Sequence, residues 1–179
     1  KKVVLVDENE MTAVMMGFPT LKGLSRETPS TYVSVLLNQN AALHYIDVAQ
    51  EFGLAGDVCP MPEAELGVSI DDDAPILGAC AVQCNTTCDG SLMSNGGIAK
   101  RLELEDGIPI FQLAAPLRHR EDDVQDYAAQ EIRNCIAFIE EKTGEKWDWQ
   151  YYFECAQRVN ESTRHRMDWP DMNKTDYSQ

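Results

Sequence analysis

Residues 75–91 read Pro75-Ile-Leu-Gly-Ala-Cys80-Ala-Val-Gln-Cys84-Asn-Thr-Thr-Cys88-Asp-Gly-Ser91. The stretch begins as a buried strand, because residues 76–82 are apolar apart from one glycine and one cysteine. It ends as a turn into a helix, with an Asn-Thr-Thr run that offers capping side chains. Open α/β sheets bind ligands where a strand gives way to a helix, and the helix N-terminus favours a thiolate. These residues therefore predict the position of a functional site.

The composition indicates one folded domain with an acidic surface. The chain has 179 residues, of which 44 % are hydrophobic and 25 % are charged, enough to build one core. The formal net charge of −15 argues against nucleic acid as a partner, because phosphate binding needs clustered Lys and Arg. No apolar run approaches the roughly 18 residues that cross a bilayer, and the apolar start of the chain breaks at Asp7. We therefore expect no membrane segment and a cytoplasmic protein with reduced thiols.

Apolar runs alternate with helical patterns along the chain, which predicts a three-layer α/β/α domain around a parallel sheet. The strands are expected at Val3–Val6, 76–82 and Ile108–Leu113, and the helices at 32–52, 63–68, 88–102, 122–142 and 147–167. Residues 8–30 stay ambiguous, and the Asn95-Gly-Gly run is expected to interrupt or distort its helix. We expect residues 1–170 to form the domain and 171–179 a linker or tail. The chain starts on a strand without an initiator Met, which leaves two interpretations open: a part of a longer protein or a natural short one.

The cysteines divide by context. Cys59 lies in a loop just before Pro60, where packing gives no reason for sulfur, and Cys88 lies in the strand-to-helix turn. Cys84 faces the same turn, whereas Cys80 points into an apolar strand and is interpreted as structural. The remaining two fall on apolar helical stripes and are expected in the core: Cys135 and Cys155.

The ligand spacing favours an iron–sulfur site over a zinc site. No CxxC pair and no Cys/His zinc pattern occurs. Thiolates supplied by separate turns suit an iron–sulfur cluster better, although the spacing alone indicates this only weakly. Three further residues follow the last predicted strand and could meet an anion, but a solvated loop is the interpretation we favour: Arg118, His119 and Arg120.

Three segments resemble a known family. The first is Gly56-Asp-Val-Cys59-Pro-Met-Pro62, and the second is Asn85-Thr-Thr-Cys88-Asp-Gly90. The third is Gly107-Ile-Pro-Ile-Phe-Gln-Leu-Ala-Ala-Pro116, followed by an acidic helix and Glu140-Glu-Lys-Thr-Gly-Glu-Lys-Trp-Asp148. In order and spacing they are similar to the 2-hydroxyacyl-CoA dehydratases, which include the 2-hydroxyglutaryl-CoA dehydratase D-component, and to benzoyl-CoA reductase subunits. The resemblance covers about residues 54–165.

The resemblance implies a Rossmann/flavodoxin-like sheet and a radical lyase. In this family each subunit has two similar α/β domains, whose cysteines hold a 4Fe-4S cluster between them. Carried over, Cys59 and Cys88 correspond to two cluster ligands, with Cys84 as a further candidate. The family eliminates water from a 2-hydroxyacyl-CoA to give an enoyl-CoA through a ketyl radical, in anaerobic amino-acid fermentation. It works with a sister subunit and an ATP-dependent activator protein, and the full assembly can carry a flavin.

Two departures from the family pattern leave other functions open. Cys80 and Cys84 are additional thiols, and the second domain with its cluster ligand is missing, so we expect this chain alone to be inactive. One alternative is an iron–sulfur reductase or electron-transfer module, benzoyl-CoA reductase-like or a double-cubane cluster protein. Another is a non-catalytic α/β domain with incidental cysteines. Fold and cluster do not specify the acyl group.

Overall fold

The sheet at the centre of the molecule is entirely parallel. A computed structural model describes residues 2–7, 12–26, 37–71, 78–84, 88–116, 118, 120–172 and 174. Within them, four strands are hydrogen-bonded in the order β2-β1-β3-β4. Their bounds are β1 (Val3–Val6), β2 (Lys22–Ser25), β3 (Cys80–Cys84) and β4 (Ile110–Leu113). Val4 pairs with Cys80 and Ala81 with Ile110, so β3 is flanked on both sides.

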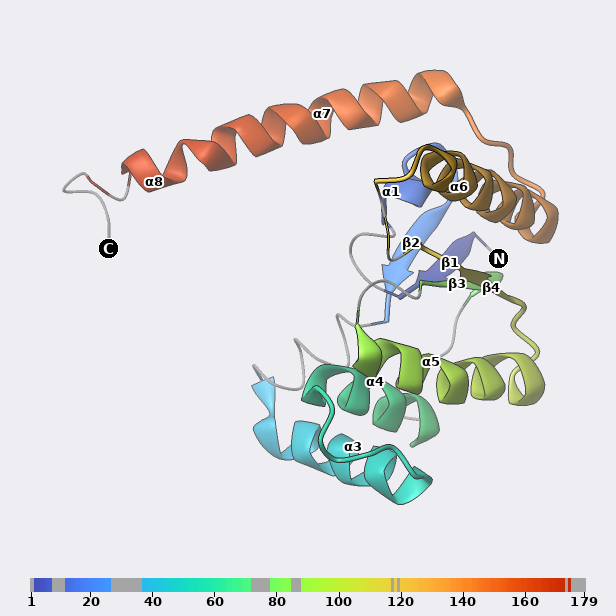
Figure 1. Ribbon diagram of the computed structural model, residues 1–179, viewed down its shortest axis with the longest axis vertical. Helices are drawn as coiled ribbons and strands as arrows, with labels where there is room; N and C mark the ends of the chain where they lie inside the picture. The colour runs from blue at the N-terminus through green and yellow to red at the C-terminus, as the bar shows by residue number, and fades with distance from the viewer. Residues whose placement is uncertain are drawn as a thin grey trace.

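Helices cover both faces of this sheet, which confirms the predicted three-layer α/β/α architecture (Figure 1). One face carries α1 (Thr12–Met15) and α6 (Asp122–Thr143). The other carries α3 (Gln39–Phe52), α4 (Pro60–Ile70) and α5 (Asp89–Lys100). The strand order matches that of flavodoxin-like sheets, in which the chain reverses its winding direction between β1 and β3.

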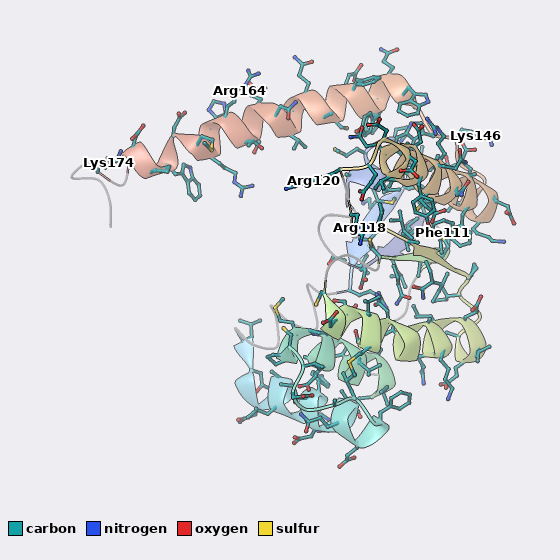
Figure 2. The ribbon with its side chains drawn as sticks, viewed as in Figure 1. Phe111, Arg118, Arg120, Lys146, Arg164 and Lys174 are labelled. Carbon is teal, nitrogen blue, oxygen red and sulfur yellow. The ribbon has the colours of Figure 1, made fainter. Side chains whose placement is uncertain are left out.

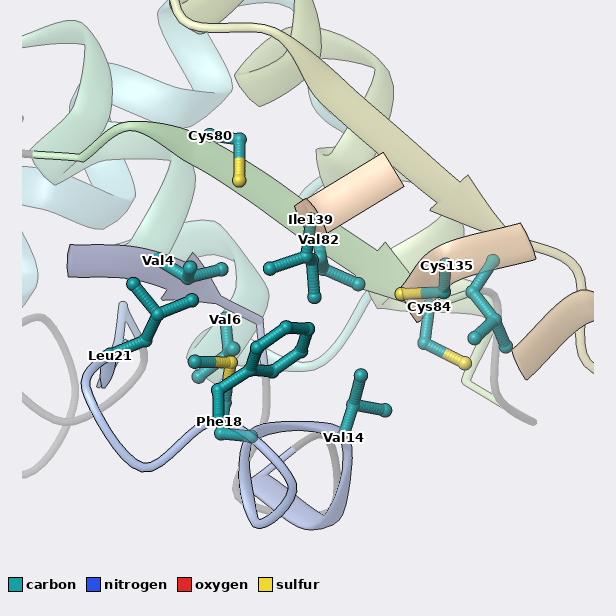
Figure 3. Packing of buried hydrophobic residues seen from close by; sticks show 12 residues of the cluster. Val4, Val6, Val14, Phe18, Leu21, Cys80, Val82, Cys84, Cys135 and Ile139 are labelled. Atoms are coloured by element: carbon teal, nitrogen blue, oxygen red, sulfur yellow. The ribbon is translucent and has the colours of Figure 1, made fainter. Parts of the chain in front are cut away.

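Each face of the sheet has its own apolar core because strand side chains alternate between the faces. The first core joins alternate residues of β1 and β3 to α1 and α6, and Figure 3 shows it around Phe18, Val82 and Ile139. The second core joins the intervening strand residues Leu5 and Ala81 to the helices of the other face. Both strands are therefore buried on both sides, as parallel strands are.

The strands agree with the sequence patterns except at one edge. The β1 prediction matches its observed bounds, and β4 lies within its predicted range. β3 ends two residues later than predicted, and the start of its predicted range falls outside the described residues. β2 was missed, because it pairs only with β1 and three of its four residues are exposed. An edge strand with the sequence Lys-Gly-Leu-Ser lacks the apolar run that identifies a buried one.

The Asn95-Gly-Gly run does not interrupt its helix, although a distortion, the other predicted outcome, follows the run as a π-helical turn. α5 is continuous to Lys100 and passes directly into a π-helical turn, Arg101–Glu105. A Cβ placed on Gly97 would lie only 2.8 Å from Leu66 Cδ1, so the missing side chain lets α5 approach α4 closely. The energetic cost of helical glycine is offset by this packing.

The helices α3 and α4 differ from prediction at their starts. α3 begins after the N-cap Asn38, whose side chain accepts from the Ala41 amide; the predicted start near residue 32 lies outside the described residues. α4 is longer than expected because Pro60 stands at its first helical position, where a missing N–H costs nothing.

The two C-terminal helices behave differently although both are amphipathic. α6 buries Cys135 and Ile139 and ends at Gly144, whose φ of 75° is accessible to glycine. The following helix, α7 (Trp149–Met167), buries no residue, and Figure 2 shows its side chains, including Arg164, spread around it away from the sheet. Cys155 on α7 is therefore half-exposed, and the expectation that it lies in the core was wrong. α8 (Trp169–Met172) follows, and none of the described helices has the length and apolarity to span a membrane.

Candidate metal centre

The residues after β3 and β4 share one edge of the sheet, because parallel strands all end on the same side. Cys88 follows β3 and Arg118 follows β4, so both belong to this carboxyl edge, as the sequence predicted. α5 runs away from the edge after β3. α4 begins at the same edge, because it packs beside α5 and both helices start at the same end in Figure 1.

Cys88 is the N-cap residue of α5. Its backbone is extended (φ −122°, ψ 110°), and its Sγ accepts a hydrogen bond from the Ser91 N–H at 3.5 Å. The side chain is half-buried. Sulfur in this position faces the unpaired amides at the start of the helix, which can donate hydrogen bonds to it.

Cys59 is the N-cap residue of α4, with the same kind of extended backbone (φ −63°, ψ 132°). The residue is exposed, and its thiol makes no capping hydrogen bond. The Cys59 sulfur therefore accepts no hydrogen bond from the first turn of α4. Two of the predicted ligands thus occupy the same structural position on two neighbouring helices.

Gly90 brings these two helix starts together. A Cβ placed on Gly90 would lie 2.8 Å from Pro62 Cγ and 3.7 Å from both the Cβ and the N of Cys59. Cys59 therefore lies against the first turn of α5 at Gly90, which follows Cys88 by two residues in the chain. Twenty-nine positions separate the two cysteines in the chain, yet the packing of α4 on α5 makes them neighbours at the edge.

The three buried thiols lie elsewhere. Cys80, Cys84 and Cys135 belong to the core on the α6 face of the sheet, as Figure 3 shows. Burial raises the pKa of Cys80 to about 11 and, together with nearby Cys80, Cys84 and Glu131, that of Cys135 to about 12. All three pack as small apolar side chains. The position of Cys84 in this core speaks against it as a third ligand.

Other candidate groups do not join the cysteine pair. Arg118 is exposed and lies 3.8 Å from Glu121, as expected for a solvated loop, and Arg120 is also exposed. His119 lies outside the described residues. In the described ranges, no three His, Cys, Asp or Glu side chains are arranged to hold a metal ion. The described part of the chain thus offers a pair of thiols, which is half of a four-ligand site.

A buried polar network contacts both helices that begin with these cysteines, and the sequence analysis missed it. Asp7 follows β1 and is 1 % exposed; its carboxylate accepts from Arg26 at 2.9 Å and from Asn95 at 3.2 Å. The Cys84 amide donates to it at 3.4 Å, and Arg26 also lies 3.2 Å from Glu65 on α4. A charged residue directly after a buried strand was the signal available in the sequence; its partners come from distant segments.

Comparison with known proteins agrees with the segments identified in the sequence. No curated protein sequence matches the chain. The profile of the family described as 2-hydroxyglutaryl-CoA dehydratase, D-component, matches residues 11–179, which is nearly the whole chain. The paired helix starts with their cysteines fall within this match. The chain therefore belongs to the 2-hydroxyglutaryl-CoA dehydratase D-component family.

Proposed function

We propose that this chain is the cluster-binding part of a 2-hydroxyacyl-CoA dehydratase, with Cys59 and Cys88 as two thiolate ligands of a 4Fe-4S cluster. Family membership supports a component of such a dehydratase. The observation that carries the assignment of residues is the contact between the starts of α4 and α5, each capped by a cysteine.

The donor set fits an iron–sulfur cluster. Such clusters take thiolate ligands, and a helix N-terminus lowers the cost of forming a thiolate. Cys59 is exposed and Cys88 half-buried, so both sulfurs are accessible to a group bound at the edge. Since the described residues supply only this pair, the other ligands must come from outside them, and we propose a second, similar domain as their source. A partner can reach the pair because Cys59 is exposed.

When bound, the cluster would supply one-electron and Lewis-acid chemistry. The chain's own contribution is to hold two sulfurs at a fixed spacing and to keep the buried thiols of the α6 face in the core, out of the site. Loss of water from a 2-hydroxyacyl-CoA to give an enoyl-CoA leaves the carbon chain unchanged.

A sister subunit, an ATP-dependent activator protein, a flavin in the full assembly and a cytoplasmic location remain predictions.

The test is metal content after anaerobic purification of the protein with its partner subunit. Cys59→Ser and Cys88→Ser should each abolish the sulfur-to-iron absorption and lower bound iron at least tenfold. The matched control is Cys80→Ser, which should keep iron and lose stability, because its sulfur lies in the α6-face core. Full iron content in Cys59→Ser would contradict the assignment.

A second measurement separates the dehydratase from a reductase or electron-transfer module of the same family. The iron-loaded assembly, with activator and ATP, should convert a 2-hydroxyacyl-CoA to the enoyl-CoA. An assembly that binds the cluster but reduces an acyl-CoA without forming this product would contradict the dehydratase assignment and leave the ligands intact.

A further inference from the structure

The network around Asp7 reaches both helices that begin with a ligand cysteine. Asn95 is on α5, whose N-cap is Cys88, and its Nδ2 donates to Asp7 Oδ2 at 3.2 Å. Glu65 is on α4, whose N-cap is Cys59, and its Oε1 lies 3.2 Å from Arg26 Nη2. That same Arg26 nitrogen donates to Asp7 Oδ1 at 2.9 Å. Asp7 therefore stands between the two helices, with one carboxylate oxygen directed to each side.

The α5 side of the network also holds the strand from which Cys88 departs. The Cys84 N–H donates to Asp7 Oδ2 at 3.4 Å, and Asn95 Nδ2 donates to the Cys84 carbonyl at 3.1 Å. Both backbone groups of the last β3 residue are thus held by the Asp7–Asn95 pair. The segment that carries Cys88 is fixed before it, at Cys84, and after it, at Asn95.

The hydrogen bonds of the Asp7 network lie in the interior of the domain, where their geometry is most strictly fixed. Asp7 is 1 % and Asn95 4 % exposed, and the side chains of Arg26 and Glu65 are about nine-tenths buried. The hydrophobic effect that drives the packing of α4 on α5 is non-directional. The charge-assisted hydrogen bonds of Asp7 with Arg26 and Asn95 have a fixed geometry, and the contact of Arg26 with Glu65 is an ion pair. The polar network therefore adds a directional constraint on the register between the two helix starts, beside the close contacts at Gly90 and Gly97.

We propose that Asp7 is a positioning residue of the metal centre, fixing Cys59 and Cys88 relative to each other through Glu65 and Asn95. This inference rests on the proposed function, because it assumes that the two sulfurs act together. Asp7 lies at the reversal point between β1 and β3, where such sheets place their ligands. At this point the chain uses the carboxylate to hold the two helices that present the ligands.

The experiment measures the spacing of the two sulfurs without metal. Homobifunctional methanethiosulfonate reagents of graded spacer length are reacted with the chain carrying Cys155→Ser, and the Cys59–Cys88 crosslink is quantified by mass spectrometry. The parent should give its highest yield with a short spacer. In Asp7→Asn this yield should fall at least fivefold and the optimum should move to longer spacers. Asn95→Ser, which leaves the Asp7–Arg26 pair in place, should produce a smaller shift in the same direction.

The control is Cys135→Ala, a change in the α6-face core outside the network. Cys135→Ala should lower stability but give the same dependence of crosslink yield on spacer length as the parent. All variants are compared at the same interval below their melting temperatures. If Asp7→Asn does not fold, Asn95→Ser decides. A parental profile in the folded variants would overturn the role of Asp7 and leave the ligand assignment intact. No Cys59–Cys88 crosslink in the parent with any spacer would instead overturn the proposed ligand pair, and this inference with it.

Discussion

The cysteines at the carboxyl edge and those behind the sheet are the same residue type in two different environments. Cys59 and Cys88 each occupy the N-cap position of a helix and are accessible, whereas Cys80, Cys84 and Cys135 pack among apolar side chains of the α6 face. Burial raises the pKa of Cys80 and of Cys135. The difference teaches that the place where an element begins, more than the local sequence around a cysteine, decides which thiol can act as a ligand.

Alkylation of the native protein is the most direct test of this difference between the cysteines at the edge and those in the core. At pH 8 a thiol with a pKa of about 11 is roughly 0.1 % thiolate, and its burial also keeps the reagent out. The exposed Cys59 should therefore react with iodoacetamide at least ~100-fold faster than Cys80 or Cys135, as followed by peptide mass spectrometry. Equal rates would show that the α6-face core opens freely. Cys155, half-exposed on α7, should react at an intermediate rate.

The edge pair can be tested by enlarging the residue between its helices. Gly90→Ala would put a methyl group 2.8 Å from Pro62, which forces the starts of α4 and α5 apart. We expect iron affinity of the anaerobic assembly to fall by about tenfold, on the order of 1.4 kcal/mol.

Gly96→Ala is the matched control for that variant, because a Cβ at Gly96 meets no described atom within 4 Å. It should leave iron binding unchanged and stabilise α5 by about 0.5–1 kcal/mol. Similar losses of iron in both variants would mean that helix propensity, and not the contact with Pro62, governs the site.

The core side of the comparison is tested by Cys135→Ser. A hydroxyl has to be buried where the thiol packed among apolar groups, at a cost of about 1–3 kcal/mol in the free energy of unfolding. Urea denaturation should show this loss, while the reactivity of Cys59 stays that of the parent. A change in Cys59 reactivity would show that the two regions are coupled through the sheet.

The smallest expected effect is on the pH dependence of stability. The folded pKa values of Cys80 and Cys135 lie above their ordinary value of 9.0. The unfolded chain therefore loses these protons first, and stability present below about pH 9 is lost as the pH rises toward 11. The double variant Cys80→Ala/Cys135→Ala should show a shallower fall between pH 9 and pH 10 in urea titrations. An identical fall in parent and variant would mean that other groups dominate.

The sequence predicts those parts of the molecule that depend on local pattern. The apolar runs of β1 and β4 and the stripe of α6 are visible because each buries a periodic set of side chains. β2 has no such run because it is an exposed edge. The Asn95-Gly-Gly run was misread because Gly97 serves a tertiary contact with Leu66, which no local rule anticipates.

The candidate site was predictable only in part, for the same reason. The motifs around Cys59 and Cys88 identified the two cysteines by their resemblance to a family, and the helix starts are local features. The position of Cys84 in the α6-face core depends on the register of β3, and the predicted strand ended two residues before the observed one. Cys155 was misplaced because α7 has an apolar stripe but no covering partner among the described residues. The network of Asp7 joins five segments of the chain and has no short-range signature.

The hydrogen bond between Asp7 and Asn95 joins residues that are 88 positions apart. During synthesis the first strand must therefore wait until α5 has emerged before its carboxylate finds this partner, because closing so long a loop precedes the contacts that reward it. The pairing of β1 with β3 is delayed for the same reason, since the two strands are separated by nearly the same length of chain. The two helix starts consequently acquire their final spacing late in folding. The proposed cluster would therefore be inserted only after the domain has nearly finished folding.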